Sequence, residues 1–237
     1  MARPTAEFRL PWFGRERLDA RRSIPRHRHR YGYIAVVLSG GYQEAGLDGR
    51  RNLSVGNVVV HHPFDAHLDH VGIAGAEVLN LPLPERSALP TGFVIDDLDA
   101  VARLAESDPA GAATLLRPAG EVRAATDWAD RLAAALIQNP DLRLAEWASE
   151  AGLAPETLSH GFRAAYGVTP ARFRIEARVR RAMTMIELGH AGLATIAADS
   201  GFADQSHLTR ALVDLTGQTP GNWRRSISFK RRIAISA

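Results

Sequence analysis

Residues 144–174 read LAEWASEAGLAPETLSHGFRAAYGVTPARFR, and residues 193–224 read LATIAADSGFADQSHLTRALVDLTGQTPGNWR. The second stretch repeats the pattern of the first. Gly167 matches Gly217 fifty positions later, and a Thr-Pro pair follows each glycine after one further residue. Each glycine predicts the end of one helix, and each Thr-Pro pair predicts the N-cap and first position of the next. Upstream of the predicted turn, matching residues such as Gly152 and Gly201 are forty-nine positions apart. The single inserted residue therefore falls in the turn, where it does not disturb helix packing. One supersecondary unit is therefore used twice.

Each copy predicts two short helices separated by a turn. In the first copy, Gly152 ends a helix, and residues 155–166 begin the next with a proline at a helix-compatible first position. Leu158, Phe162 and Tyr166 recur every four residues and predict a buried face. The second copy predicts helices over 194–200 and 205–216, with Asp204 as the N-cap and the inward residues Leu208, Leu212 and Leu215. Both copies have the layout of a helix-turn-helix.

The segment between the copies predicts a single connecting helix. It covers about residues 170–188, which gives a length of roughly 28 Å at 1.5 Å per residue. One turn of B-DNA separates successive major-groove faces by about 34 Å. A rigid connector of this length can hold two reading helices on one side of a duplex.

The same residues resemble a known family. The chain contains the series Leu-Ala-x-x-Ala-x-x-Ala-Gly-Leu (144–153), Leu-x-x-x-Phe-Arg-x-x-Tyr-Gly-Val-Thr-Pro (158–170), Ile-Ala-x-x-Ser-Gly-Phe-x-Asp-x-Ser-His-Leu-x-Arg (196–210) and Thr-Gly-x-Thr-Pro-x-x-Trp-Arg (216–224). Together they resemble the AraC/XylS transcription regulators over about residues 123–226. The resemblance implies that the second helix of each copy enters the major groove. The residues it implies as DNA contacts are Glu156, Ser159, His160 and Arg163 in the first copy, and Gln205, Ser206, Thr209 and Arg210 in the second.

Some residues depart from the family pattern. Gly161 lies inside the first reading helix, at a cost of roughly 1 kcal/mol relative to alanine. Glu156 accepts a hydrogen bond from a cytosine amino group or else repels phosphate. In the second copy, leucines stand where the family usually has phenylalanine, and Val213 replaces a basic residue. We therefore expect Gln205 and Arg210 to contribute more to base reading than the first copy does.

Composition restricts the remaining functions. The chain of 237 residues is long enough for two domains. Residues 1–120 carry 14 basic and 14 acidic residues, whereas residues 121–237 carry 15 and 12, so the net charge of +3 lies in the proposed DNA-binding part. Without cysteine the chain has no disulfide and no thiolate metal site. No apolar run reaches membrane-spanning length and no signal-peptide core is present, so we expect a cytoplasmic protein with no membrane partner.

The N-terminal part, residues 1–84, predicts short antiparallel strands. The expected strands cover 33–38, 42–47, 53–55, 58–62, 67–71 and 76–81, with a turn at 39–41 and a hairpin at Asp48-Gly49. Short strands at this spacing favour a small barrel or jelly roll. Over residues 15–83, the series His27-x-His29, Ser39-Gly40-Gly41, Val55-Gly56-Asn57 and Pro63 before His67 resembles the cupin-like sensing domain often found ahead of this DNA-binding module.

Six of the nine histidines lie in this part. His27 and His29 project to the same face of a strand, since side chains alternate with a period of two. One interpretation is an effector pocket formed by His27, His29, Tyr31, Tyr33 and His67. The other is a divalent metal, such as zinc, on His27, His29 and His67. Metal-binding cupins place a glutamate four residues after the pair, where this chain has Tyr33, and neighbouring arginines disfavour a cation.

The rest of the chain connects these parts. Residues 85–120 predict a linker and helices over 96–116, which either pack on the barrel or form a homodimer contact. A long helix is expected over 121–138, with an apolar stripe that includes Leu132 and Leu136. The DNA-binding domain then covers 121–226, and residues 227–237 form a basic tail.

The sequence therefore predicts an α+β multidomain chain. An N-terminal antiparallel β-barrel, a cupin-like jelly roll, precedes an all-α domain with two helix-turn-helix units. The implied function is a transcription regulator that binds double-stranded DNA and responds to a small-molecule effector. It is not an enzyme in this interpretation. Two alternatives remain open: a metal-dependent cupin enzyme whose helical part serves assembly, and a ligand-binding module whose helices hold a partner protein.

Overall fold

The computed structural model describes residues 8–9, 13–84, 87–189 and 191–225. The chain divides into two compact units. The β unit contains the described residues up to 130 together with 162–167, and the helical unit contains residues 131–161 and the described residues from 168 onward. The predicted basic tail at 227–237 lies outside the described residues.

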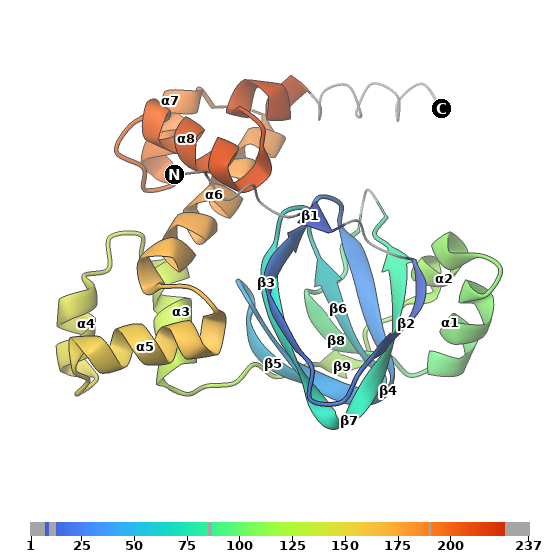
Figure 1. Ribbon diagram of the computed structural model, residues 1–237. Coiled ribbons are helices and arrows are strands. Elements are labelled where there is room, and N and C mark those ends of the chain that lie inside the picture. The colour runs from blue at the N-terminus through green and yellow to red at the C-terminus, as the bar shows by residue number, and fades with distance from the viewer. Residues whose placement is uncertain (1–7, 10–12, 85–86, 190, 226–237) are drawn as a thin grey trace. The chain divides into compact units, whose positions relative to one another are not determined.

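The β unit is built on one sheet (Figure 1). Among the described residues the sheet has nine strands, in the order β1-β3-β7-β4-β6-β8-β9, with β2 paired to β7 and β5 paired to β4. Their bounds are β1 (Phe8–Arg9), β2 (Gly14–Leu18), β3 (Ser23–His29), β4 (Tyr33–Gly46), β5 (Gly49–Ser54), β6 (Asn57–His61), β7 (Ala66–Pro82), β8 (Gly92–Val94) and β9 (Gly120–Glu121).

The sheet is antiparallel, as predicted, apart from the short parallel pair β1–β3. The prediction of a closed barrel is wrong, because the pairings among the described residues run from β1 to β9 without returning to the start. Both end strands are two residues long, which leaves too few backbone groups to join the two edges.

Two long strands replace four predicted short ones. Residues 39–41 do not form a turn: β4 continues through them, and its register against β7 shifts between Val37 and Ser39 and again between Gly40 and Tyr42. Gly40 has φ +66°, and a Cβ atom there would lie 2.0 Å from the carbonyl oxygen of Gly75. The glycines therefore allow close strand crossing at a bulge. The predicted hairpin is confirmed by the pairing of Gly46 with Gly49.

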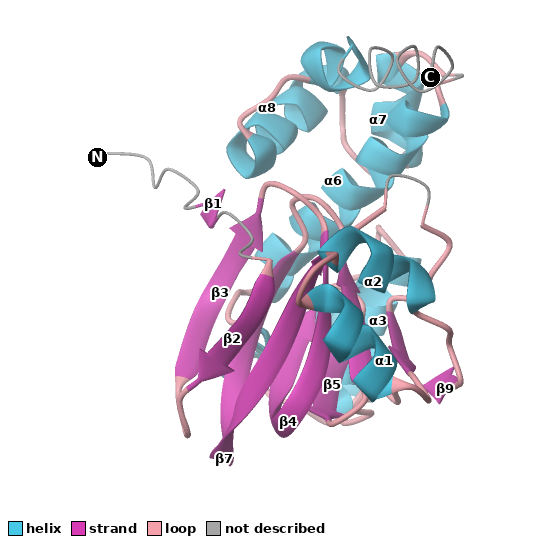
Figure 2. Cartoon of the chain, turned by 90° about the vertical axis from the view of Figure 1, so that its right-hand side faces the viewer, coloured by secondary structure: helices cyan, strands magenta, loops and turns pink. Residues whose placement is uncertain are grey.

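The two faces of the sheet bury different side chains. On β4, Ile34 and Val36 join a core cluster with Phe93 and residues of two helices, whereas Tyr33 and Ala35 join a second cluster. This alternation follows from the period of two in a strand. The helices are α1 (Leu98–Ala105) and α2 (Pro109–Leu115), and they lie against one face of the sheet in Figure 2.

The predicted linker therefore belongs to the β unit. Segment 85–120 contributes β8 and Gly120 of β9. Its two helices bury Val101, Ala105 and Ala112 in the core on one face of the sheet. Of the two uses that the sequence left open, packing on the sheet is the one observed. The side chains of Asp97 and Asp108 cap the two helices by accepting hydrogen bonds from backbone N–H groups.

The helix predicted over 121–138 begins later than expected. Its observed counterpart is α3 (Trp128–Gln138), and residues 120–121 pair with β8 instead. The Asp127 carboxylate accepts hydrogen bonds from the backbone N–H groups of Ala129 and Asp130, so the first turn of α3 is stabilised at that point. The apolar pattern could not show that strand pairing competes for residues 120–121.

The remaining helices match their predicted bounds closely. They are α4 (Leu144–Glu150), α5 (Pro155–Tyr166), α6 (Pro170–Leu188), α7 (Leu193–Asp199) and α8 (Gln205–Thr216). Thr169 and Asp204 cap α6 and α8 through their side chains, as predicted for Asp204 and for the Thr-Pro pair. The predicted inward residues Leu158, Phe162 and Leu212 are buried. None of the described helices combines the length and apolar character that crossing a bilayer requires.

Candidate DNA-reading helices and histidine-lined cavity

Helix α5, the predicted first reading helix, has one buried and one exposed face. The buried face consists of Leu158, Phe162 and Tyr166, and the rings of the last two stack with centroids 4.8 Å apart. The predicted contact residues lie on the other face, and all of them are exposed: Glu156, Ser159, His160 and Arg163. The 3.6-residue period of the helix thus separates the packing residues from the polar ones.

Helix α8 repeats this separation. Leu208, Leu212 and Leu215 are buried, whereas the predicted contacts Gln205, Ser206 and Arg210 are exposed. Thr209 is half-buried, and its hydroxyl donates a 2.9 Å hydrogen bond to the backbone carbonyl of Gln205. This bond holds the Thr209 hydroxyl against the backbone of its own helix.

The two copies are held through α6 and the loop before α4. Arg174 and Arg178 of α6 donate hydrogen bonds to the backbone carbonyls of Leu142 and Pro140. At the turn of the second copy, a Cβ atom on Gly201 would lie 2.8 Å from Cβ of Pro140. Glycine at 201 therefore allows this turn to approach the loop of the first copy closely. The contact explains one of the paired glycines that the sequence repeat showed.

The β unit contains a polar cavity of about 130 Å³. It is lined by side chains from β2, β3, β4 and β7, which come from well-separated parts of the sequence. The lining residues are Glu16, Leu18, Ile24, His27, His29, Tyr33, Ala35, Tyr42, Glu44, His67, Asp69, Val78 and Asn80. A cavity of this volume holds a few water molecules or a small polar ligand.

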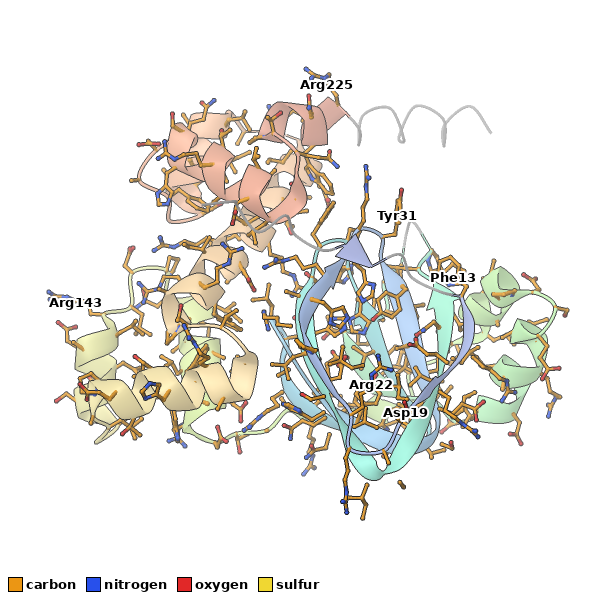
Figure 3. The ribbon with its side chains drawn as sticks, in the orientation of Figure 1. Phe13, Asp19, Arg22, Tyr31, Arg143 and Arg225 are labelled. Carbon is orange, nitrogen blue, oxygen red and sulfur yellow. The ribbon has the colours of Figure 1, made fainter. Side chains whose placement is uncertain are left out.

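Four of the five residues predicted for an effector pocket line this cavity: His27, His29, Tyr33 and His67. The fifth, Tyr31, is 52% exposed and is absent from the lining. Figure 3 shows Tyr31 at one end of the sheet, with its ring directed outward. The guanidinium carbon Cζ of Arg30 lies 5.9 Å from the centre of the Tyr31 ring. Tyr31 thus lies between the end of β3 and the start of β4, outside the cavity that the other four residues line.

The histidines form one close group. His27 on β3 is the pairing partner of His67 on β7, and their ring centroids are 4.4 Å apart. His29 lies 4.9 Å from His27 by the same measure. The Tyr33 hydroxyl lies 3.4 Å from Nε2 of His29 and 3.5 Å from Nε2 of His67, which places it between the two imidazoles. The potential ligand atoms of the three histidines all lie within 4.8 Å of one another. A metal on these three remains a prediction.

Sequence reasoning missed the acidic half of the cavity. Glu16, Glu44 and Asp69 all line it, and His61 contacts Glu44 with 3.4 Å between Nε2 and Oε2. Simple alternation from Tyr33 would put Glu44 on the opposite face of β4. The bulge after Val37 adds one residue, and this shift turns Glu44 toward the histidines. The Ser39-Gly40-Gly41 sequence was the available signal for that bulge.

Burial decides the charge states in this group. Burial, followed by repulsion from neighbouring histidines, lowers the pKa of His61 and of His67 well below the usual value, so both are neutral near pH 7. Burial raises the pKa of the Glu44 carboxyl well above its usual value, and the nearby Asp69 carboxylate raises it further. The group thus contains neutral imidazoles and carboxyl groups that share one poorly solvated space. Such a group favours a ligand that brings positive charge.

One comparison with known families matches the helical part. Residues 147–226 match a family described as a helix-turn-helix domain. The arabinose operon regulatory protein of Escherichia coli (strain K12) is 30% identical over 88 residues, which are 37% of this chain and 30% of that protein. The chain thus matches less than a third of the length of this relative. The family match covers most of the predicted duplicated unit, and the matched relative is a regulatory protein.

Solved structures give a more remote likeness. ToxT from Vibrio cholerae strain SCE256, with a bound unsaturated fatty acid, is 11% identical, with 89% of this chain and 93% of that chain covered and a TM-score of 0.42. The DNA-binding domain of AdpA, in complex with a target DNA, is 22% identical, with 45% of this chain and 98% of that chain covered and a TM-score of 0.42.

Proposed function

We propose that the protein is a sequence-specific, DNA-binding transcription regulator of the AraC/XylS type, since residues 147–226 match a helix-turn-helix domain. The observation that carries the proposal is the duplicated unit, in which α4–α5 and α7–α8 have the same layout and are joined by the 19-residue helix α6. The two helix-turn-helix copies read two adjacent segments of the major groove. The partner is double-stranded DNA, which locates the protein in the cytoplasm of a bacterial cell.

The exposed faces of α5 and α8 supply the contacts in this proposal. Arg210 donates two hydrogen bonds to a guanine, and Gln205 pairs with an adenine, as these side chains do in the major groove. Ser206 and Thr209 contact bases or phosphate beside them. On α5, Arg163 contacts phosphate, and Glu156, Ser159 and His160 face the bases. All of these side chains except the half-buried Thr209 are exposed, opposite the buried apolar face of their helix, and this supports the assignment.

The cavity of the β unit is the proposed effector site. His27, His29, Tyr33 and His67 offer imidazole and phenol groups to a small, polar ligand, and about 130 Å³ limits its size. Tyr31 has no part in this site, because it is exposed and outside the lining. For the ligand to regulate, it must bind the DNA-competent and DNA-incompetent states with different affinities.

We do not retain the cupin-enzyme alternative, because residues 147–226 match a helix-turn-helix domain and the matched relative is a regulatory protein. The partner-protein alternative differs from DNA binding in one measurable respect. Phosphate contacts release counterions, so DNA affinity falls steeply with salt, whereas binding of a protein partner depends on salt far less.

The test is selection of bound sequences from a random duplex pool by the purified full-length protein, without added ligand. Two enriched blocks about one helical turn apart are the expected result. Arg210→Ala should remove the preference at one position of one block. Val213→Ala, on the exposed side of the same helix, is the matched control and should leave both blocks unchanged.

Other results would change the proposal in defined ways. Enrichment of four blocks, arranged as two copies of the expected pair, would indicate that two copies of the chain bind as a homodimer. One block alone would mean that α5 contacts only the backbone of the DNA. Absence of enrichment, combined with salt-insensitive binding to any duplex, would contradict DNA reading and favour the partner-protein alternative.

A further inference from the structure

His67 lies between two sets of side chains that could bind a metal. One is the predicted set with His27 and His29, and the other is formed with Glu44 and His61. In each set, one ligand atom per residue lies within 4.8 Å of the others. We infer that Glu44, His61 and His67 bind one divalent transition-metal ion. Nothing in the sequence pattern pointed to Glu44 or His61.

The three side chains come from neighbouring strands. Glu44 is on β4, His61 is the last residue of β6, and His67 is the second residue of β7 (Figure 1). Strand β4 pairs with both of the others, so the sheet fixes the spacing of the three residues. Each of them is buried, and His67 is only 3% exposed. A site on rigid strands holds its ligands in place before the ion arrives.

The distances suit coordination. Nε2 of His61 and Oε2 of Glu44 are 3.4 Å apart. Bonds of 2.0–2.2 Å to zinc at tetrahedral angles separate two ligand atoms by about 3.3 Å. Atoms that start within 4.8 Å of one another reach that spacing through small side-chain rotations. Two histidines with one carboxylate also leave coordination positions open for water or a further ligand.

The charges around the site favour a cation. Besides Glu44, the carboxylate of Asp69 lies 3.8 Å from Nε2 of His67, and Asp48 and Asp65 also act on Glu44. Arg51 is the opposing charge near Glu44 and His61, and Arg26 is the one near His67. The carboxylates outnumber these two arginines. A divalent ion would offset the repulsion between Glu44 and Asp69.

One of the two ring nitrogens of His67 is available to coordinate an ion. Its Nδ1 atom is buried and has no hydrogen-bond partner among the residues that the structure describes. Its Nε2 atom faces Asp69 and the Tyr33 hydroxyl. Metal-binding histidines usually donate their second ring N–H to a carboxylate or another acceptor, and Asp69 can fill that role. A buried nitrogen with no partner costs free energy, and an ion would remove that cost.

The predicted set is less suitable for an ion. His27, His29 and His67 contain no carboxylate, so they would not neutralise a divalent charge. Nδ1 of His27 lies 3.0 Å from the carbonyl oxygen of Pro25, which leaves its Nε2 for an ion. The set with Glu44 borders two cavities. A second cavity, of about 20 Å³, shares Glu44 and His67 with the large one and adds His61 to its lining.

The test measures metal binding by the full-length protein alone, so its outcome does not depend on DNA binding. Protein stripped with a chelator is titrated with Zn²⁺, Co²⁺, Ni²⁺ and Mn²⁺ by calorimetry, and bound metal is counted after gel filtration. We expect one ion per chain. About a hundredfold excess over the Kd should raise the Tm by roughly 10 °C. Bound Co²⁺ should give visible absorption typical of mixed nitrogen and oxygen ligands.

Variants then identify the ligands. Glu44→Gln and His61→Gln should each weaken binding at least about tenfold. His70→Gln is the matched control, since His70 is exposed on the same strand as His67 and belongs to neither set. Glu44→Gln keeps the shape of the side chain, and the Tm of each metal-free variant shows whether it folds.

Two results would overturn the site. The first is that none of the four ions binds to the folded wild-type protein. The second is that binding survives Glu44→Gln and His61→Gln but is lost in His27→Gln and His29→Gln, which would assign the ion to the predicted set.

Discussion

Nη1 of Arg172 lies 2.6 Å from Oδ2 of Asp214, and this ion pair joins the connecting helix α6 to the second reading helix α8. Nε of the same guanidinium lies 3.3 Å from Oε1 of Glu176, which is 4% exposed. Arg172 therefore serves two carboxylates in very different surroundings. Asp214 is half-exposed, so water screens its interaction, whereas the one with Glu176 is screened much less.

This difference predicts unequal effects of two substitutions. Arg172→Ala should lower the free energy of unfolding by about 1–3 kcal/mol, because the buried Glu176 loses a charged hydrogen-bond donor. Asp214→Asn should cost less than about 1 kcal/mol, because exposed ion pairs contribute little. Urea titration of both variants measures the two values. Equal losses would show that the exposed pair matters as much as the buried one.

The leucines of α8 are predicted to stabilise the second helix-turn-helix. Leu212→Ala should cost about 2–5 kcal/mol, because Leu212 is fully buried and the substitution leaves a cavity. Val213→Ala, one residue later at 36% exposure, should change stability by less than about 0.5 kcal/mol. The measurement is the Tm of each variant. Similar Tm values would contradict the inward assignment of Leu212.

Arg163 is predicted to contact phosphate. Arg163→Ala should weaken binding to all DNA sequences by a similar factor, and the slope of log K against log salt should become shallower by about 1. Arg181→Ala, an exposed arginine on α6, is the control and should leave the slope unchanged. A change in sequence preference, with the slope unaltered, would instead assign Arg163 to base reading.

The Tyr166 hydroxyl donates a 2.8 Å hydrogen bond to the Asp130 carboxylate. Burial and this bond raise the pKa of Tyr166 above its ordinary value. Above about pH 10 the unfolded chain loses the phenol proton while the folded protein keeps it, so the free energy of unfolding falls as the pH rises. Tyr166→Phe should cost about 1.5–3 kcal/mol at pH 7.

The difference in stability between wild type and Tyr166→Phe should therefore shrink between about pH 10 and pH 11. Urea titrations of both proteins at pH 7, 9, 10 and 11 provide the measurement. The comparison isolates Tyr166, because every other titrating group is common to both proteins. A difference that stays constant over this range would contradict the raised pKa.

Gly40 is predicted to be essential for the bulge in β4. Gly40→Ala should prevent the native strand crossing, because the added Cβ would lie 2.0 Å from a backbone oxygen and the residue has φ +66°. Gly46→Ala, in the same strand, is the control, since its nearest contact would be an ordinary 3.5 Å. Near-ultraviolet circular dichroism and the Tm should report loss of packing in the first variant alone.

The sequence by itself determined the helical part of this protein. Caps such as Thr169 and Asp204, stop signals such as Gly217, and the spacing of Leu208 and Leu212 are local features that act within one or two helical turns. The repeat added a second, independent copy of each feature. For this reason the bounds of α5, α6 and α8 were predicted correctly.

The tertiary structure alone decided the arrangement of the β unit. Residues 85–120 were predicted as a linker with helices, and residue 121 as the start of a long helix. Backbone hydrogen bonds instead join Gly92–Val94 and Gly120–Glu121 to the sheet. The same holds for the cavity. A bulge of one residue in β4 reverses which side chains face inward, and this reversal brings Glu44 to His61 and His67. Strand register depends on pairing between segments far apart in the chain, so local sequence periodicity cannot fix it.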